Sequence, residues 1–471
     1  TANNVYYAQN SYKRFPSLVN YSTNNIGADS RGAGSFRDNA GNVFNFVANN
    51  TDIYQLDGGT FTSRKSSLTG TNTDYFTFTQ FGNYIIASNG VDAPQYYLMG
   101  TSTNFANLSA IATGVPTFRV SGVVRDFLVT GNQSSNQNRI QWSGINDITT
   151  WTAGSKQADQ QDLPGSGGEI VHITSGEIGY VFRQNQIVRM DYVGGATIFR
   201  LSVISPNRGA VYGRTVCQDN RRVFFYADDG FFEINGDNVI AIGAEKVNRF
   251  FDVDLNKAFS DRICAAVDPF NQLALWLYPS ASNTSNTTGI CDKILIYNYA
   301  TKKWSTADAS ASTIFSQFVG AYTVELMDII SENLDQINIA LDTDFWSGGQ
   351  LYLGAIDSNY KAAIFSGTEN EGTIETRELE LFPGHRSSIT NVRPIVDATS
   401  TVTVKTRERL ADTPTESSVS TMNDSGDNPV RESGRYFRLK IVTPSGSVWT
   451  HAQGVDVIAT KIGLRWQIKL I

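Results

Sequence analysis

The feature of this sequence that most constrains its fold is a phrase that recurs along the first two-thirds of the chain. Each copy consists of a short apolar stretch, a polar turn and a second stretch rich in Tyr, Phe or Trp. Successive copies lie 41 to 53 residues apart. Because four-stranded blades repeat every ~40–50 residues in β-propellers, the phrase predicts a propeller. Six copies are clear, with first stretches centred on Phe44, Ile85, Leu128, Val181, Phe224 and Leu275.

Polar insertions explain the longer intervals. They lie at 155–168 and 280–289 and consist largely of Gly, Ser, Asn, Gln and Thr. A seventh, weaker copy spans 350–365, and the acidic stretch before it predicts an insertion at about 310–346. We therefore expect a propeller over 1–372 with six or seven blades.

Strand and turn chemistry favour this fold. Each blade is covered on both faces by its neighbours, so its strands should be apolar on both sides, as at 273–277. The turns at 57–59 and 235–236 contain Gly or Asn, which accept positive φ. The ring must also close, and we expect residues 4–7, or the strand after them, to pair into the last blade. A stack of β-sandwiches is the competing interpretation.

The pattern of apolar and polar residues changes at about residue 373. Apolar and polar residues alternate strictly at 373–381 and 401–407, and again at 436–441. Strict alternation indicates antiparallel strands with one face exposed to solvent. The region 373–471 is therefore expected to form a small β-sandwich-like domain.

Composition limits the classes of function. The chain has 471 residues, of which 41% are hydrophobic and 18% charged. This length favours two or more domains. The net charge of −7 disfavours a protein that binds nucleic acid through its phosphates. No N-terminal stretch has the charged-then-apolar pattern of a signal peptide. The three cysteines, Cys217, Cys264 and Cys291, have no C-x-x-C spacing, so we expect buried thiols rather than disulfides or a zinc site.

No catalytic motif stands out, and we expect no enzyme, cofactor or metal. Asp228 and Asp229 could form a general acid and base pair, but a turn is the favoured interpretation of this segment. Asp252 and Asp254 are likewise interpreted as residues that flank a helix end rather than as a catalytic pair. The glycine-rich segment 165–168 precedes a strand rather than a helix, so it is expected to be a loop and not a phosphate cradle.

The three histidines are isolated in sequence. His172 lies in an apolar run, where a hydrogen-bonded core histidine is the favoured interpretation. His385 and His451 stand beside turn-like residues and are expected to be solvated.

The sequence also contains several distinctive phrases. They are an Arg-Phe-Pro opening at 14–16, a Trp-Ser-Gly-Ile-Asn-Asp phrase with a following Trp at 142–151, and further segments at 194–199, 229–236 and 242–247. These segments resemble the podophage tail nozzle, or tail hub, proteins, most distinctively over 139–251. The order of domains resembles that of the packaged-DNA stabilisation proteins of P22-like phages.

The resemblance implies a structural role in the virion. Such a protein would be assembled in the host cytoplasm into a homo-oligomer, a ring of six subunits below the portal and adaptor. The ring would enclose the DNA exit channel and carry tail fibres, tailspikes or a needle, while DNA passes through without specific binding. Channel-facing residues should then be acidic or neutral, because negative walls repel phosphates. Our candidates for a channel or rim loop are Glu325, Asp328, Glu332 and Asp335.

The C-terminal segment 463–471 alternates apolar and polar residues to its end. It is either the final strand of the sandwich or a strand that adds to a neighbouring subunit or the adaptor. The candidate inter-subunit contacts are Leu464, Trp466, Ile468 and Leu470.

A carbohydrate-binding or glycoside-cleaving β-propeller is the alternative function. Such a protein would show convergent carboxylates and exposed aromatic side chains in the axial pocket, whereas a tail subunit would show large flat sides built for oligomer contacts.

Overall fold

The computed structural model describes residues 2–195, 197–318, 351–367 and 370–462. The chain is an all-β protein that forms a β-propeller followed by a C-terminal β domain. Its internal contacts define two units. The propeller unit comprises Leu18–Asp292 and Ser310–Phe365, and the sandwich unit comprises Thr1–Ser17, Lys293–Ala309 and Ser366–Ile471.

Five consecutive four-stranded sheets make up most of the propeller unit, and in each the neighbouring strands are antiparallel and follow one another in sequence. The first sheet contains β5 (Gly32–Arg37), β6 (Val43–Ala48), β7 (Ile53–Asp57) and β8 (Thr60–Lys65). The second contains β9 (Thr77–Phe81), β10 (Tyr84–Ser88), β11 (Gln95–Leu98) and β12 (Ala106–Asn107). The third contains β13 (Phe118–Val124), β14 (Phe127–Gln133), β15 (Asn136–Trp142) and β16 (Asp159–Asp162). The fourth contains β17 (Ile170–Ile173), β18 (Ile178–Arg183), β19 (Ile187–Tyr192) and β20 (Phe199–Ser205). The fifth contains β21 (Cys217–Asp219), β22 (Arg222–Ala227), β23 (Gly230–Asn235) and β24 (Asn238–Ala241).

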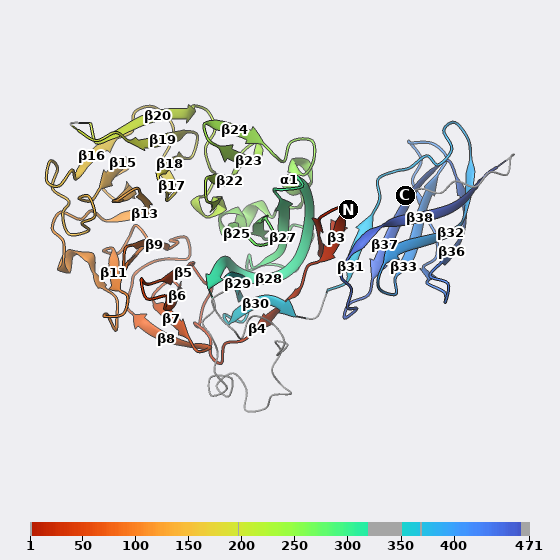
Figure 1. Ribbon diagram of the computed structural model, residues 1–471, viewed down its shortest axis with the longest axis horizontal. Coiled ribbons are helices and arrows are strands. Elements are labelled where there is room, and N and C mark those ends of the chain that lie inside the picture. The colour runs from red at the N-terminus through yellow and green to blue at the C-terminus, as the bar shows by residue number, and fades with distance from the viewer. Residues whose placement is uncertain (1, 196, 319–350, 368–369, 463–471) are drawn as a thin grey trace. The chain divides into compact units, whose positions relative to one another are not determined.

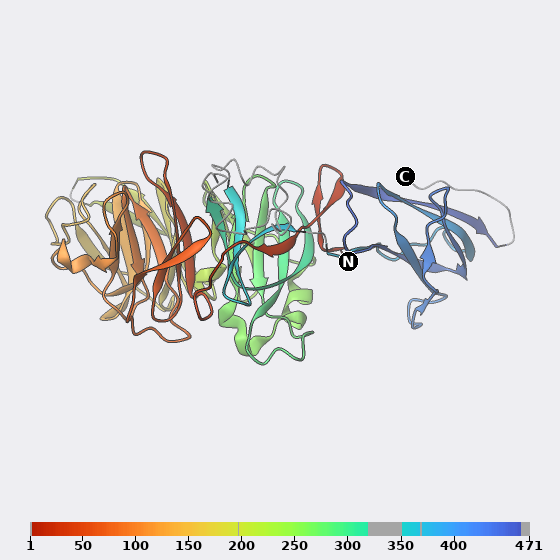
Figure 2. The ribbon, with the colours of Figure 1, turned by 90° about the horizontal axis from the view of Figure 1, so that it is seen from below.

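Two groups of strands from a single 13-stranded sheet complete the ring seen in Figure 1. One begins with the antiparallel pair β25 (Cys264–Asp268) and β26 (Leu273–Tyr278). The other contains the second half of β28 (Lys303–Phe318), then β29 (Leu351–Asp357), β30 (Ala362–Gly367) and β4 (Ser17–Asn20). Figure 2 shows the strands of these sheets running close to the direction along which Figure 1 is viewed.

The sequence repeats correspond to the two central strands of successive sheets. The first copy forms β6 and β7, and the seventh, weaker copy forms β29 and β30. The hairpin turns follow the predicted glycines, with φ of 52° and 77° at Gly58 and Gly59 and 64° at Gly236.

Neighbouring sheets share apolar cores. Phe46 and Ile53 of the first sheet pack in one cluster with Ile85 and Tyr97 of the second. The ring closes in the same way, because Val47 and Leu56 of the first sheet cluster with Ile356 and Ile364 of β29 and β30. This sharing is why the strands must be apolar on both faces.

The sandwich unit has two packed sheets. One contains β1 (Ala2–Asn3), β31 (Gly372–Glu375), β37 (Tyr436–Thr443), β33 (Thr401–Arg407), β34 (Thr415–Glu416) and β35 (Ser420–Thr421). The other contains β2 (Val5–Ala8), β3 (Ser11–Arg14), β38 (Ala452–Lys461), β32 (Ser387–Val396) and β36 (Asn428–Gly434). Val402, Phe437 and Leu439 of the first sheet meet Ile389 and Val457 of the second in a single buried cluster.

Helical structure is limited in the described residues to α1 (Asn248–Asp254) and three short 3₁₀ turns at Leu108–Ala110, Gly213–Thr215 and Lys257–Arg262. None of these helices is long and apolar enough to cross a membrane.

The structure differs from the predicted boundaries in three places. Residues 310–318, expected within an insertion, are strand because their backbone pairs with β29. Residues 4–7 do not close the ring; β2 pairs with β3 instead, and β4 is the N-terminal strand that pairs with β30. The chain does not pass from one unit to the other once at 372. It crosses after Ser17, inside β27 (Cys291–Asn298), inside β28 and after Phe365.

Candidate functional site: the propeller axis

The innermost strands of the propeller unit surround an axial cavity of about 600 Å³. Its wall is formed by residues of β5, β9, β13, β17, β21, β25 and β28, one strand from each four-stranded sheet and from each of the two strand groups that complete the ring. Close approach around the axis requires small residues. A Cβ atom at Gly213 would lie 1.9 Å from the carbonyl oxygen of Val171.

The charged side chains that line this cavity all have partners inside the chain. Arg119 forms an ion pair with Asp74 at 3.1 Å, and Arg214 donates to Thr313 Oγ1 at 2.9 Å. Glu169 accepts hydrogen bonds at 3.1 Å from Asn132 and Gln184. Asp261 accepts one from the Tyr75 hydroxyl at 2.9 Å.

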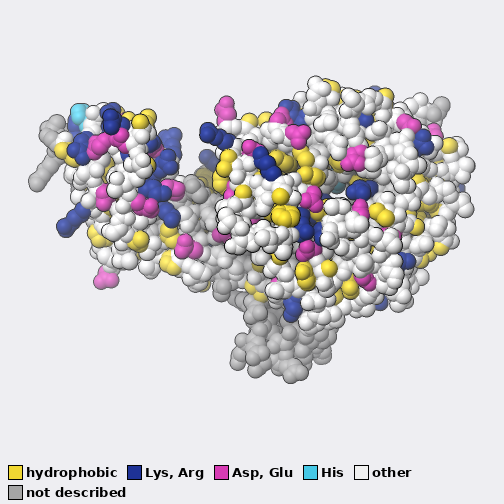
Figure 3. Space-filling model, turned by 180° about the vertical axis from the view of Figure 1, so that it is seen from behind, with side chains coloured by type: hydrophobic (Ala, Val, Ile, Leu, Met, Phe, Trp, Pro, Cys, Tyr) yellow, Lys and Arg dark blue, Asp and Glu magenta, His cyan; other side chains and the backbone are white. Residues whose placement is uncertain are grey.

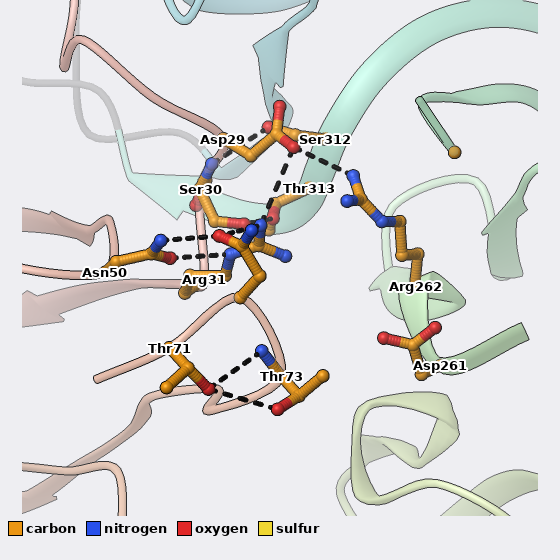
Figure 4. Close-up of polar contacts among 12 residues, drawn as sticks. Asp29, Ser30, Arg31, Asn50, Thr71, Thr73, Asp261, Arg262, Ser312 and Thr313 are labelled. Carbon is orange, nitrogen blue, oxygen red and sulfur yellow. Dashed lines mark hydrogen bonds and ion pairs between the residues drawn. The ribbon is translucent and has the colours of Figure 1, made fainter. Parts of the chain in front are cut away.

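Tyr75 is the centre of a polar cluster in the cavity wall, and Figure 4 shows Asp261, Arg31 and Arg262 of the same cluster. The guanidinium groups of Arg214 and Arg31 lie 4.3 and 5.7 Å from its ring centroid. Burial raises the pKa of Tyr75 above its usual value, and Asp261 raises it further. The phenol therefore stays protonated and donates to Asp261.

His172 also lines the cavity, from β17. Its ring makes an edge contact with Phe182, with centroids 6.3 Å apart. Burial lowers its pKa to about 4, so the imidazole is neutral at pH 7. The sequence predicted a core histidine, and His172 is instead half-buried in the cavity wall.

The glycine-rich loop 165–168 wraps around a cation rather than a phosphate. Arg183 is fully buried and donates to the carbonyl oxygens of Pro164, Gly165 and Gly168 at 2.8, 3.2 and 2.8 Å. It also donates to Gln186 and Asn138. Because the loop turns carbonyl oxygens inward, it matches a guanidinium with its five donors.

The Trp-Ser-Gly-Ile-Asn-Asp phrase builds a structural turn. Asp147 accepts hydrogen bonds from Thr149 and Thr150, and it forms an ion pair with Lys156. The two indoles donate to backbone oxygens, Trp142 to Gln157 and Trp151 to Ile148. This phrase, one of those that carry the resemblance, is therefore an internally hydrogen-bonded corner of the third sheet.

Three of the four carboxylates in the two candidate pairs have partners within the chain. Asp229 lies in the exposed turn between β22 and β23 and pairs with Arg208. In α1, Asp252 pairs with Lys257 and Asp254 accepts from the Tyr278 hydroxyl.

The thiols behave as predicted. Cys217, Cys264 and Cys291 are buried and free, and burial raises the pKa of each. Among the residues that the structure describes, no cluster of His, Cys, Asp and Glu is arranged to hold a metal ion. His385 and His451 are exposed, as predicted.

Two predicted sets of residues lie outside the described part of the chain. They are the candidate channel loop of Glu325, Asp328, Glu332 and Asp335, and the candidate contacts Leu464, Trp466, Ile468 and Leu470.

Sequence reasoning missed three arginines that line a small cavity beside the propeller axis. Arg31, Arg214 and Arg262 are far apart in sequence and no motif surrounds them. In the sequence, a single arginine between turn residues resembles an ordinary surface residue. The three arginines come together only when the ring closes.

On the face of the propeller unit shown in Figure 3, basic and acidic side chains are interspersed rather than gathered by sign. A protein that grips a phosphate backbone usually presents a continuous basic face.

Comparisons with known proteins assign no family. No family model and no curated protein sequence matches the chain. Similar solved structures include the extracellular domain of a putative hybrid two-component system from B. thetaiotaomicron, with 12% identity, a TM-score of 0.43, and coverage of 80% of this chain and 43% of that one. The mitotic checkpoint complex contains a chain with 10% identity and a TM-score of 0.39, covering 74% of this chain and 97% of that one. The Pan2 WD40 domain of Neurospora crassa has 8% identity and a TM-score of 0.39, covering 76% and 97%. This chain therefore spans less than half of the first of these structures, and the likenesses concern the fold alone.

Proposed function

We propose that this chain is a non-enzymatic structural subunit of a short-tailed phage tail, in the position of the nozzle or hub. In this role six copies form a ring around the DNA exit channel, below the portal and adaptor, and carry tail fibres, tailspikes or a needle. The proposal starts from the resemblance over 139–251, where the matching residues serve to build the fold.

The observation that supports an architectural role is the state of the charged groups at the propeller axis. Arg119, Glu169, Arg214 and Asp261 each have a partner within the chain. A glycosidase needs one carboxyl group that holds a proton for the leaving oxygen and a second that attacks or activates water. Glu169 and Asp261 are instead both occupied by hydrogen bonds from neutral side chains.

The assembly test compares the oligomeric state of the full chain alone and with a purified portal–adaptor complex. We expect a ring of six copies on the complex, measured by native mass spectrometry and negative-stain microscopy. A chain that stays monomeric in both conditions would overturn the proposal.

The C-terminal segment provides a variant for the same assay. Replacing the apolar set Leu464, Trp466, Ile468 and Leu470 with Ser should block ring formation and leave the Tm of the monomer unchanged. The matched control replaces Arg465, Gln467 and Lys469 with Ala in the same segment and should assemble normally. A fall in monomer Tm in the apolar variant would instead assign the segment to the sandwich core.

A protein that lines a DNA channel should bind duplex DNA only weakly. Proteins that bind DNA by its phosphates lose affinity steeply as salt rises. We expect the full chain to show no salt-dependent retention of duplex DNA in a filter-binding assay, and tight binding at low salt would contradict a passive conduit.

The axial cavity keeps the carbohydrate alternative open to test. Its wall includes Phe36, Tyr75 and Tyr212, and aromatic rings are common in ligand pockets. Binding on a glycan array, or release of reducing sugar that disappears in Asp261→Asn, would favour that function over an architectural one.

A further inference from the structure

Three arginines meet beside the closing seam of the propeller, and Figure 4 shows two of them, Arg31 and Arg262, on either side of Asp29. Arg31 directly precedes β5 of the first sheet, Arg214 lies in the 3₁₀ turn before β21, and Arg262 ends the 3₁₀ turn before β25. All three line one small cavity together with Ser312 of β28. The cluster thus joins the start of the ring to its last strands.

Two of the arginines share one carboxylate. Asp29 accepts from Arg262 at 2.8 Å and lies 3.7 Å from Arg31. Arg31 is 3% exposed and is otherwise held by neutral amides, with Asn50 at 2.9 Å and Asn72 at 3.3 Å.

Arg214 has no carboxylate of its own among the described residues. Its hydrogen bonds go to Thr313 Oγ1 at 2.9 Å and to the Ser312 carbonyl at 3.5 Å, and its guanidinium lies over the Tyr75 ring. Asp261, the other carboxylate in the cluster, accepts its hydrogen bond from Tyr75 rather than from an arginine.

The cluster therefore carries an uncompensated positive charge. Three guanidinium groups, Arg31, Arg214 and Arg262, face two carboxylates, Asp29 and Asp261, and the two thiols nearby, Cys264 and Cys291, stay protonated because burial raises their pKa. Burial is the main cause that lowers the pKa of Arg31; Tyr75 and Asp29 oppose the shift, and repulsion by Arg262 and Arg214 adds to it. Arg31 is buried, whereas Arg214 and Arg262 are partly buried. Because like charges held close together outside bulk water repel one another, a counter-ion among the three groups would stabilise the fold.

The cavity between the arginines has a volume of about 10 Å³, which is roughly the space that one water-sized particle needs. Its wall contains Asp29, Ser30, Arg31, Arg214, Arg262 and Ser312. The space is too small for a phosphate, a sulfate or an organic carboxylate. Water would fit but would leave the surplus charge in place.

We propose that this cavity binds a monovalent anion of halide size, chloride under physiological conditions. The ion neutralises the surplus charge among the three guanidinium groups and links the segment 29–31 to β28 and to the turns that carry Arg214 and Arg262. It acts as a structural counter-ion at the seam and is independent of the proposed role in a phage tail.

Bromide provides a direct test, because it replaces chloride and scatters X-rays anomalously. Crystals of the full chain soaked in sodium bromide should show an anomalous peak between Arg31, Arg214 and Arg262. An ordered water at that position without an anomalous peak would overturn the proposal.

Stability in solution provides a second test. At constant ionic strength, replacing gluconate with chloride should raise the Tm by roughly 5 °C once chloride exceeds its Kd a hundredfold. In Arg214→Met the cluster is neutral without the ion, so its Tm should not depend on chloride. The matched control is Arg119→Met, which removes an axial arginine that already has Asp74 as its partner, and it should keep the dependence. A chloride dependence that persists in Arg214→Met would rule out this site; if that variant fails to fold, the bromide experiment still decides.

Discussion

Arg183 shows how a single residue can organise a loop that looks flexible in sequence. Its guanidinium donates hydrogen bonds to the carbonyl oxygens of Pro164, Gly165 and Gly168 and so holds the glycine-rich loop in one conformation. Glycine is needed in this loop for two reasons. Gly165 and Gly168 have φ of 81° and 79°, and a Cβ at Gly167 would lie 2.7 Å from the guanidinium carbon.

Replacing Arg183 with Met should lower the free energy of unfolding by about 2–4 kcal/mol, because buried carbonyl oxygens lose their donor. Urea unfolding at pH 7 measures the change. Arg139→Met, which removes only a partly exposed ion pair with Asp162 in the neighbouring sheet, should leave the midpoint nearly unchanged. Equal effects of the two substitutions would contradict the role assigned to Arg183.

His172 makes the stability of the propeller unit sensitive to mild acid. Its pKa is about 4 in the folded chain because of burial, against about 6.5 in an unfolded chain. The unfolded state therefore takes up a proton first, and stability present above pH 6.5 is lost as the pH falls towards 4. We expect a loss of about 2–3 kcal/mol from this group, and a smaller fall in His172→Phe over the same range. Parallel pH profiles of the two proteins would show that His172 is not responsible.

At the level of elements, the sequence was most informative where strands are apolar on both faces. Both central strands of each sheet could be recognised because doubly covered strands leave a strong apolar signal. Outer strands leave no such signal. β16 consists of Asp-Gln-Gln-Asp and is a strand only because it pairs with β15. The same reason explains why residues 310–318 resembled an insertion.

Asp147 fixes the corner that joins β15 and β16. The ion pair with Lys156 is the main cause that lowers the pKa of this carboxyl, followed by hydrogen bonds from Thr149. Asp147→Ala should lower the free energy of unfolding by about 1–2 kcal/mol at pH 7. The difference from the unaltered chain should shrink as the pH falls below about 4, since the carboxylate stabilises the fold only while it is ionised. Asp126→Ala, which removes an exposed carboxylate from the β13–β14 turn, is the control and should change the midpoint little in urea unfolding.

For the whole molecule, the kinds of domain could be predicted but their chain segments could not. Periodicity distinguishes a propeller from a half-exposed sandwich, because the two bury their strands differently. It does not indicate which N-terminal strand pairs with which distant strand. The site was equally hidden, since Arg31, Arg214 and Arg262 meet only after the ring has closed.

A chain cut at the boundary predicted from sequence should therefore be defective. Ending it at residue 372 removes β37 and β38 and nearly all of β31, so β1 loses β31 and β3 loses β38, and only β28 and β2 remain to pair with them. Limited proteolysis with mass spectrometry should show rapid cleavage within residues 1–17 of the shortened chain and protection in the full chain. Equal protection in both would mean that these residues are held by other contacts.

The assignment of residues 1–17 to the sandwich unit also has a consequence for synthesis of the protein on the ribosome. Asn3 pairs with Thr373 of β31, and Tyr12 pairs with Ala452 of β38, so these partners are synthesised about 370 residues or more after the strands that need them. At about 5–20 residues per second the wait is on the order of 20–70 s or longer. A nascent chain that stalls before this point leaves β1 without β31 and β3 without β38, and these open strand edges distinguish it from the folded protein.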